Sequence, residues 1–245
     1  LLMAVIVMPV LTVSSFANHW IVGEAGSQVT FYFYNVAAGV SQFGVMLLAV
    51  NRYFRVVRPT LYPKIFSKRS SALMVVTTWI VTILVSASIP LLGIRYEHNE
   101  SYPLSFFLYS PNKTIFIYYG TALSVYKVFP FFVICSCYIR IYQTTRQHNT
   151  AASPSSLEGN SPYGVNEARI TRLLTVVVVG FYLCWIPPYV VRVLEMLNML
   201  PTTAARYLSF LHLFPIFTSS VINPIAYGVM NQLFRSEFVK IVRCR

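Results

Sequence analysis

Aspartate is absent from this 245-residue chain, and charged residues of every kind are scarce. They make up 11% of the sequence, and the seven acidic residues are all glutamates, whereas roughly a quarter of an average soluble domain is charged. Without aspartate no Ser-His-Asp set can form, and neither a zinc-binding motif nor a phosphate-binding loop occurs. We therefore expect neither an enzyme nor a bound cofactor.

Cysteine is nearly as rare. Cys135, Cys137 and Cys184 fall inside long apolar runs, and Cys244 lies in the C-terminal tail. No pair is left outside the apolar runs to form a disulfide. Because Cys135 and Cys137 have no further metal ligands nearby, we interpret them as small buried side chains and expect no metal site there.

Apolar sequence, in contrast, is abundant: 56% of the residues are hydrophobic and 16% are aromatic. Apolar runs of about 18 residues or more can cross a hydrocarbon layer of about 30 Å as helices. These runs lack the alternation of barrel strands, so helices are the structure that lipid permits. We predict an all-α, polytopic membrane protein with a single domain over residues 1–245. The expected spans are 1–17, 28–51, 71–93, 115–139, 173–198 and 205–229.

Lysine and arginine predict the orientation, because short cytoplasmic loops collect them. Asn99 and Asn112 begin acceptor sequons on the opposite, outer face and are candidate glycosylation sites. We attribute the net charge of +12 to contacts with anionic lipid rather than with nucleic acid. The basic residues that define the cytoplasmic face are Arg52, Arg55, Arg58, Lys64, Lys68, Arg69, Arg140, Arg146, Arg169, Arg172, Arg235, Lys240, Arg243 and Arg245.

Two segments on the cytoplasmic side are not expected to cross the membrane. Residues 147–166 are rich in Ser, Pro, Gly and Asn, which predicts a flexible loop. Residues 231–243 repeat apolar side chains at helical spacing between charges, which predicts an amphipathic helix on the membrane surface. Cys244 follows this helix and is a candidate for lipidation, with an unmodified thiol as the alternative.

Short motifs follow the spans in a fixed order, and together they resemble the rhodopsin-like, or class A, G-protein-coupled receptors. The Asn-Arg-Tyr variant, the Ser-Lys-Arg-Ser loop end and the segment 227–232 look most like the melatonin-receptor-related group and the invertebrate Moody/Tre-like receptors. The motifs are Asn51-Arg52-Tyr53, Trp79, Pro130, Tyr138, Cys184-Trp185-Ile186-Pro187 and Asn223-Pro224-Ile225-Ala226-Tyr227.

The resemblance implies a seven-helix receptor of the plasma membrane that responds to a small-molecule or peptide ligand and activates a heterotrimeric G protein. Helix one and the start of helix two would then precede Leu1. Two alternatives stay open. A polytopic transporter or channel would carry paired acidic residues or repeat-related broken helices, which are absent. A receptor-like fragment that does not signal would keep the fold without the switch.

The resemblance also implies an activation switch at the cytoplasmic helix ends. An arginine at membrane depth is costly unless it is paired, and Glu167 stands where many such receptors place the partner of Arg52. We expect an Arg52–Glu167 ion pair that holds the resting state, with a snorkelling arginine as the alternative.

Prolines are expected to mark the points at which the helices bend when the switch operates. Pro187 removes a backbone hydrogen bond and bends its helix below Trp185. Asn223-Pro224 loosens the last helix in the same way, so that Tyr227 would turn toward Tyr138 in the active state. The alternative is that prolines are simply common in membrane helices.

The ligand is constrained mainly by exclusion. Tyr34 occupies the position where amine receptors carry an aspartate, and Phe217 stands where opsins carry the retinal-linking lysine. We therefore expect a ligand that is neither an amine nor retinal. A lysine and an arginine at membrane depth favour an acidic or polar ligand, although Lys127 facing water or pairing with Glu195 is the alternative. The expected pocket residues are Tyr34, Asn35, Lys127, Trp185, Arg192 and His212, the last of which is otherwise an ordinary packed histidine.

Two departures from the family pattern follow from the same alignment of motifs. Ser27 stands where the family places the first cysteine of its outer disulfide, and residues 94–114 contain no cysteine. We expect the outer loop to be held by packing alone. The family's sodium site would keep only Ser41 and Asn223 as remnants.

Overall fold

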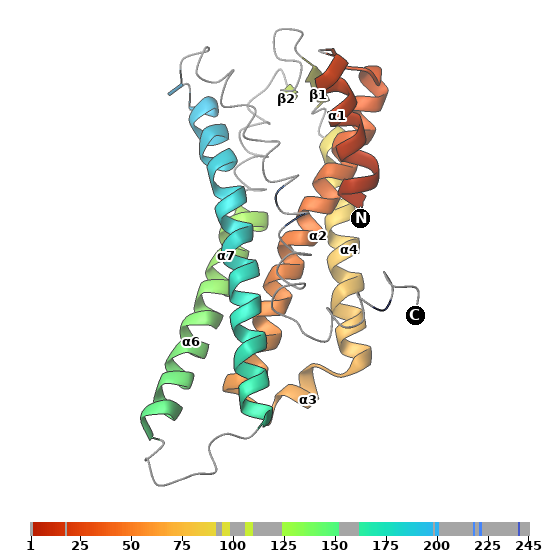
Figure 1. The fold of residues 1–245 in the computed structure, drawn as a ribbon. Coiled ribbons are helices and arrows are strands. Elements are labelled where there is room, and N and C mark those ends of the chain that lie inside the picture. Colours follow the sequence, from red (N-terminus) through yellow and green to blue (C-terminus); the bar gives the residue numbers. More distant parts are fainter. Residues whose placement is uncertain are drawn as a thin grey trace.

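The computed structural model describes residues 2–17, 19–91, 95–98, 106–109, 124–151, 162–197 and 199–200, together with residues 218, 221 and 240. Successive long helices run antiparallel in a bundle, and a strand pair lies at one end (Figure 1). The elements are η1 (Met3–Val7), α1 (Met8–Ala17), α2 (Gly23–Val57), α3 (Tyr62–Ile65), α4 (Lys68–Leu91), β1 (Arg95–His98), β2 (Phe106–Tyr109), η2 (Ser124–Val128), α6 (Phe129–Ala151) and α7 (Pro162–Met196).

Four of the described helices are long and apolar enough to cross a membrane: Gly23–Val57, Lys68–Leu91, Val125–Gln147 and Thr171–Val191. They match the predicted spans that begin near 28, 71, 115 and 173, and the shorter apolar helix Met3–Ser14 matches the first. The predicted span 205–229, the surface helix 231–243 and Cys244 lie outside the described residues, apart from the helical positions 218, 221 and 240.

Two local features differ from the sequence-based expectations. β1 and β2 pair antiparallel with Arg95 opposite Tyr109, so the otherwise helical chain carries a small hairpin at the end of the bundle opposite α3 (Figure 1). The predicted loop 147–166 is shorter than expected, because α6 continues to Ala151 and α7 begins at Pro162. Polar composition therefore did not stop either helix at the ends of the predicted loop.

Both π-helical turns, η1 and η2, run directly into a proline. Pro9 and Pro130 lie two residues beyond the ends of these turns. A proline ring clashes with the carbonyl four residues earlier, which belongs to Val5 in η1 and to Tyr126 in η2. A wider π-turn at that point gives the ring room while the helix continues.

The turn between α1 and α2 depends on Gly23, whose φ of +64° lies in the left-handed region that glycine tolerates. Its carbonyl accepts hydrogen bonds from Trp20 Nε1 at 3.1 Å and from Ser27 Oγ at 2.8 Å. Ser27 is buried, and its hydroxyl donates to a carbonyl of its own helix. This local bonding occupies the position where the family pattern would place a cysteine.

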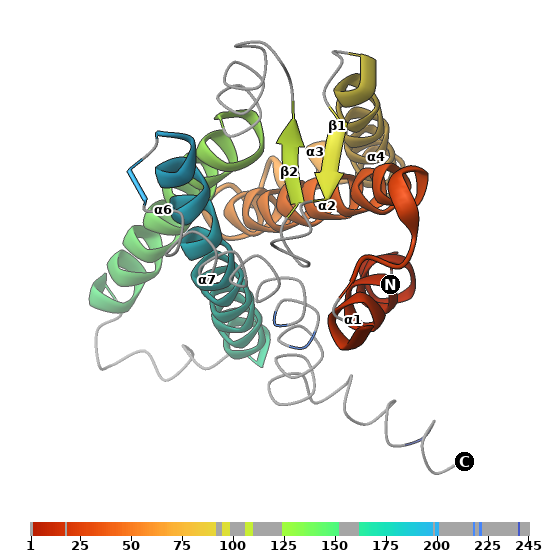
Figure 2. The ribbon, with the colours of Figure 1, turned by 90° about the horizontal axis from the view of Figure 1, so that it is seen from above.

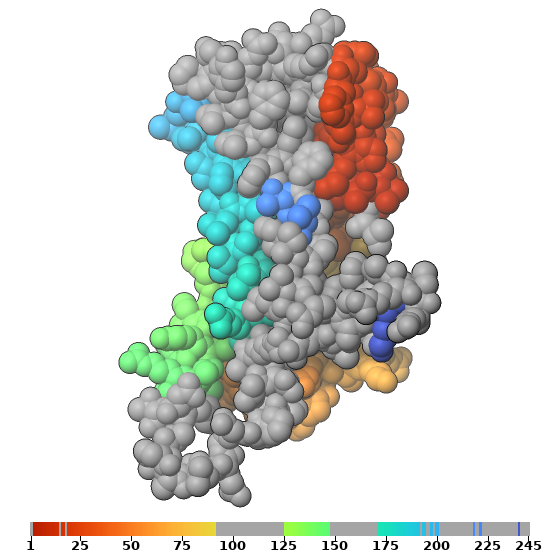
Figure 3. Space-filling view, viewed as in Figure 1, coloured from red at the N-terminus to blue at the C-terminus, as the bar shows by residue number. Residues whose placement is uncertain are grey.

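α2 is the central helix of the described bundle and contacts α4, α6 and α7 (Figure 2). At Gly39 the approach leaves no room for a side chain: a Cβ there would lie 2.8 Å from Thr82 Cγ2 and 2.9 Å from Tyr126 Cε1. The buried core joins α2, α6 and α7 and consists of Ala38, Val45, Ala49, Ile134, Cys137, Val178, Phe181, Cys184 and Trp185. α1 and α7 lie on opposite sides of the face shown in Figure 3.

Candidate ligand site and cytoplasmic switch

A polar chain links three helices at the centre of the bundle. Lys127 lies in η2, just before α6, and its Nζ donates a hydrogen bond to Gln42 Oε1 of α2 at 3.0 Å. Gln42 is completely buried, and its Nε2 donates to the Tyr182 hydroxyl of α7 at 2.5 Å. Because each hydrogen bond joins two helices, α6 or α7 can move only if these bonds break or if the partner helices move with it.

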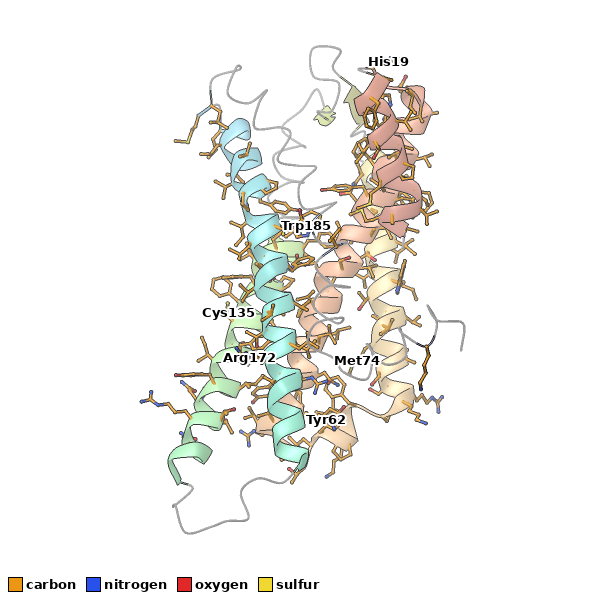
Figure 4. The ribbon with its side chains drawn as sticks, viewed as in Figure 1. His19, Tyr62, Met74, Cys135, Arg172 and Trp185 are labelled. Atoms are coloured by element: carbon orange, nitrogen blue, oxygen red, sulfur yellow. The ribbon has the colours of Figure 1, made fainter. Side chains whose placement is uncertain are left out.

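The ammonium of Lys127 also lies over aromatic faces of α7. Its Nζ is 4.4 Å from the centroid of Trp185, 4.5 Å from that of Tyr189 and 5.9 Å from that of Phe181. A cation within about 6 Å of a ring centroid is attracted by the ring quadrupole. Trp185 points from α7 toward α2 (Figure 4), where its ring contacts Tyr34 at a centroid distance of 6.3 Å.

Three of the predicted pocket residues are therefore close together: Tyr34, Lys127 and Trp185. Asn35 is half-buried, and its Nδ2 donates to the Phe31 carbonyl one turn earlier at 2.8 Å. The side chain of Arg192 and all of His212 lie outside the described residues. Their part in the pocket stays a prediction.

The structure bears on one of the two alternatives considered for Lys127. Its ammonium contacts Gln42 and the rings of α7 rather than an open outer vestibule. The other alternative, pairing with Glu195, stays open, because the side chain of Glu195 lies outside the described residues. Among the described side chains, no carboxylate lies within ion-pair distance of Lys127.

Sequence reasoning missed the polar and aromatic neighbours of Lys127. Gln42 follows Tyr34 by eight residues, and Phe181 and Tyr189 precede and follow Trp185 by four, so helical spacing puts each set on one face. That spacing was available in the sequence. Which face of α2 meets which face of α7 was not.

The indole N–H of Trp185 is a donor that has no acceptor among the described residues. Trp185 is 2% exposed, and its Nε1 has no hydrogen-bond partner among the described residues. Pro187 and Pro188 follow within the same helix, which stays helical through both. Each proline removes one backbone N–H from the helix ladder, so the predicted pivot lies directly beside this indole.

Three of the predicted switch residues, Asn51, Arg52 and Tyr53, lie in the last two turns of α2. Asn51 Nδ2 donates to the Tyr62 hydroxyl of α3 at 3.4 Å, and the Arg55 guanidinium lies 5.3 Å from the Tyr62 ring centroid. The Asn51 hydrogen bond, assisted by Arg55 and Arg52, lowers the pKa of Tyr62. Tyr62 was not singled out in the sequence, and it lies at the end of the bundle away from Trp185 (Figure 4).

Arg52, Tyr53 and Tyr138 are half-buried near this end. The Tyr138 hydroxyl has no acceptor or donor within hydrogen-bond distance among the described residues. The side chain of Glu167, and all of Asn223, Pro224 and Tyr227, lie outside those residues. The Arg52–Glu167 ion pair therefore stays a prediction.

The remaining candidate sites are only partly described. Ser41 is exposed on α2, and Asn223, Asn99 and Asn112 lie outside the described residues. Within the described part of the chain, no three His, Cys, Asp or Glu side chains gather as metal ligands. Cys135, Cys137 and Cys184 are free thiols, the last two of them buried.

The fold is that of a seven-helix receptor, represented here in part. The structure is similar to the crystal structure of squid rhodopsin, with a TM-score of 0.82 at 23% sequence identity over 99% of this chain and 73% of that one. Residues 1–227 match the family described as 7 transmembrane receptor (rhodopsin family). The chain belongs to this family and is a multi-pass protein of the plasma membrane.

Relatives with different ligands in their names match at similar levels. A QRFP-like peptide receptor of Branchiostoma floridae is 24% identical over 100% of this chain and 66% of its own length. Melatonin receptor type 1C of Xenopus laevis is 26% identical over 99% of the chain and 56% of its own. 5-hydroxytryptamine receptor 2 of Aplysia californica is 24% identical over 100% and 65%. The chain thus spans 56% to 66% of the length of these three relatives.

These matches confirm the class A resemblance and the prediction that the chain is not an enzyme, because the relatives are receptors. They give weak support to the melatonin-receptor-related group, since peptide and amine receptors match about as well. The Moody/Tre-like placement stays a prediction.

Proposed function

We propose that this protein converts the binding of an extracellular ligand into nucleotide exchange on a heterotrimeric G protein. The observation that carries the proposal is the position of α2. The middle of this helix holds Gln42 in the polar chain beneath Trp185, and its last two turns hold Asn51-Arg52-Tyr53 beside α3. A single rigid helix therefore connects the candidate ligand site with the surface that would meet the G protein.

The mechanism is a shift between two populations of the bundle. In the resting state Lys127 and Gln42 tie α7 to η2 and α2, and Arg52 pairs with Glu167 at the cytoplasmic end. A ligand that binds better when α7 has swung outward shifts the population toward that form. Pro187 and Pro188 permit the bend, and the freed Arg52 is then available to the G protein.

The ligand is neither an amine nor retinal. Tyr34 lies against Trp185 at the position where an aspartate would bind an ammonium group, and Phe217 stands in place of the retinal-linking lysine. The buried cation of Lys127 favours an acidic or polar ligand, small molecule or peptide. Arg192 and His212 would complete the pocket from the outer end of the bundle.

The test uses the full-length protein in membranes with a purified heterotrimeric G protein. Glu167→Ala is expected to raise basal nucleotide exchange about fivefold or more, because allosteric coupling free energies are typically ~1–3 kcal/mol. Arg52→Ala is expected to abolish exchange. Glu158→Ala in the cytoplasmic loop and Arg69→Ala at the start of α4 are the matched charge controls.

Unchanged exchange in both switch variants, at equal surface expression, would contradict the proposal. Ion or solute flux through the reconstituted parent protein would favour a transporter or channel instead. A folded, membrane-inserted parent that supports no exchange with any G-protein class would favour a receptor-like protein that does not signal.

A further inference from the structure

The strongest unexplained feature of the bundle is a positive charge without a negative partner among the described side chains. Lys127 is held by one amide oxygen and by ring faces, and no described carboxylate lies within ion-pair distance of it. Charged side chains inside membrane bundles are rare and are usually paired or functional. Ring faces attract a cation but do not neutralise it.

A count of donors identifies what is missing. An ammonium group has three N–H donors, and the described structure supplies one oxygen acceptor, Gln42 Oε1. The indole of Trp185 is a donor only, and its buried Nε1 has no partner among the described residues. The Gln42 Nε2 adds no acceptor, because it is a donor and bonds the Tyr182 hydroxyl. Among the described residues, Lys127 and Trp185 thus lack a further hydrogen-bond acceptor.

We infer that Lys127 and Trp185 form a subsite for the carboxylate of an organic acid, placed at the level of the α7 prolines. One carboxylate offers two oxygens and a single negative charge, which match one ammonium and one indole N–H. A phosphate would require more cations than the described part of the site provides. The surrounding rings of Phe181 and Tyr189 suit a ligand whose body is apolar.

Binding at this subsite has a mechanical consequence. A carboxylate that accepts from Lys127 competes with the rings and with Gln42 for the same ammonium. As Lys127 turns toward the ligand, its ammonium leaves the ring faces of Trp185 and Tyr189 on α7, and the carboxylate bridges it to the Trp185 N–H instead. Recognition of the carboxylate and the rearrangement of the contact with α7 would then be one event. This inference rests on the proposed receptor function, but its binding step can be measured without a G protein.

The experiment follows Trp185 fluorescence in the full-length protein reconstituted in lipid nanodiscs. Subtracting the emission of a Trp185→Phe variant isolates the signal of this indole. The probe is hexanoate, with hexanamide as its neutral match and chloride as the inorganic anion. We expect a saturable change with hexanoate, at least tenfold weaker responses to hexanamide and chloride, and at least a tenfold rise in the hexanoate Kd in Lys127→Met.

Control variants keep the test decisive. Lys64→Met removes a cation at the cytoplasmic end and should leave the Kd unchanged. Lys127→Arg keeps the charge and should retain binding even if Lys127→Met folds poorly. The inference is overturned if hexanoate causes no saturable change, if hexanamide acts equally, or if chloride acts alone. Binding that appears only in Glu195→Gln overturns it too, because the chain's own carboxylate then fills the subsite.

Failure of the subsite and failure of the receptor function give different results. Lys127-dependent hexanoate binding without any effect on nucleotide exchange would keep the subsite and contradict the proposed function. Exchange that responds to Glu167→Ala and Arg52→Ala while hexanoate never binds would keep the function and remove the subsite.

Discussion

α4 and α7 are both apolar helices that carry polar side chains, yet they satisfy those side chains in different ways. In the most apolar stretch of each, 17% of α4 is buried and 50% of α7. On α4 the hydroxyls of Thr78, Thr82 and Ser88 bond carbonyls of their own helix, at Met74, Thr78 and Val85. On α7 Thr175 bonds the Thr171 carbonyl in the same way, but the Tyr182 hydroxyl accepts from Gln42 of α2.

This difference in hydrogen bonding separates helices that can face lipid from helices whose movements are coupled to those of a neighbouring helix. A hydroxyl bonded within its own helix needs nothing from its neighbours, so α4 exposes Leu73, Ile80 and Leu84 outward without an unmet polar group beside them. A polar group bonded across helices makes the position of one helix depend on another. The predictions below test this contrast, beginning with the largest expected effect.

Gln42→Leu should be the most damaging substitution in the described bundle. It removes the acceptor of Lys127 and the donor to Tyr182, and hydrogen bonds to charged groups contribute about 1.5–3 kcal/mol each. We expect a loss of about 3 kcal/mol, measured as the drop in thermal stability of purified protein in nanodiscs. The matched control is Gln143→Leu on the exposed side of α6, which should change little.

The double variant Gln42→Leu/Lys127→Met sharpens that result. Removing both partners of a buried polar pair is less costly than removing one, so part of the stability should return, with a coupling of about 0.5–3 kcal/mol. Additive losses would show that the two residues do not depend on each other.

Gly39→Ala should destabilise the contact between α2 and its neighbours by about 1–3 kcal/mol, the usual cost of overpacking. Its new Cβ would press on Thr82 and on the Tyr126 ring. Gly44→Ala on the same helix meets nothing within 4 Å and should stabilise by about 0.5–1 kcal/mol through helix propensity. Thermal melting of the two variants side by side tests the prediction, and equal shifts would contradict it.

Thr78→Val should have almost no effect, within about 0.5 kcal/mol. The lost hydroxyl bonded only to Met74 of its own helix, and that carbonyl keeps its backbone partner. A loss in melting temperature comparable with that of Gln42→Leu would break the contrast between α4 and α7.

The smallest effect is expected at the exposed cytoplasmic end. Because the pKa of Tyr62 is lowered, mainly by the Asn51 hydrogen bond, the folded form favours its tyrosinate. The resulting stabilisation is present above the unfolded pKa of about 10 and is lost as pH falls through the folded pKa. The titration of Tyr62 is isolated by subtracting the tyrosinate absorbance of Tyr62→Phe from that of the parent. When both proteins also carry Asn51→Ala, this difference should titrate at higher pH.

The sequence predicts the helices well because lipid allows few alternatives to a long apolar run. The motif spacing also brought Tyr34, Trp185 and Lys127 into one expected pocket, and the structure places these three together. Gln42 and Tyr182 were missed because their partnership depends on how α2 crosses α7, which no local pattern encodes. The β1–β2 hairpin was missed because it lies outside the spans, where hydropathy carries no signal.

The π-turn η2 changes which side chains a helical wheel assigns to each face of this segment. Five residues occupy the turn before Pro130, and a helix with 3.6 residues per turn advances by about 100° for each residue. A wheel extended backward from α6 with the usual period therefore misplaces the η2 side chains by about one position. On such a wheel the first residues of η2 would be turned from their true direction by about 100°, and Lys127, near its end, by less. Alanine scans or cysteine-labelling maps of this receptor need a separate phase on each side of Pro130.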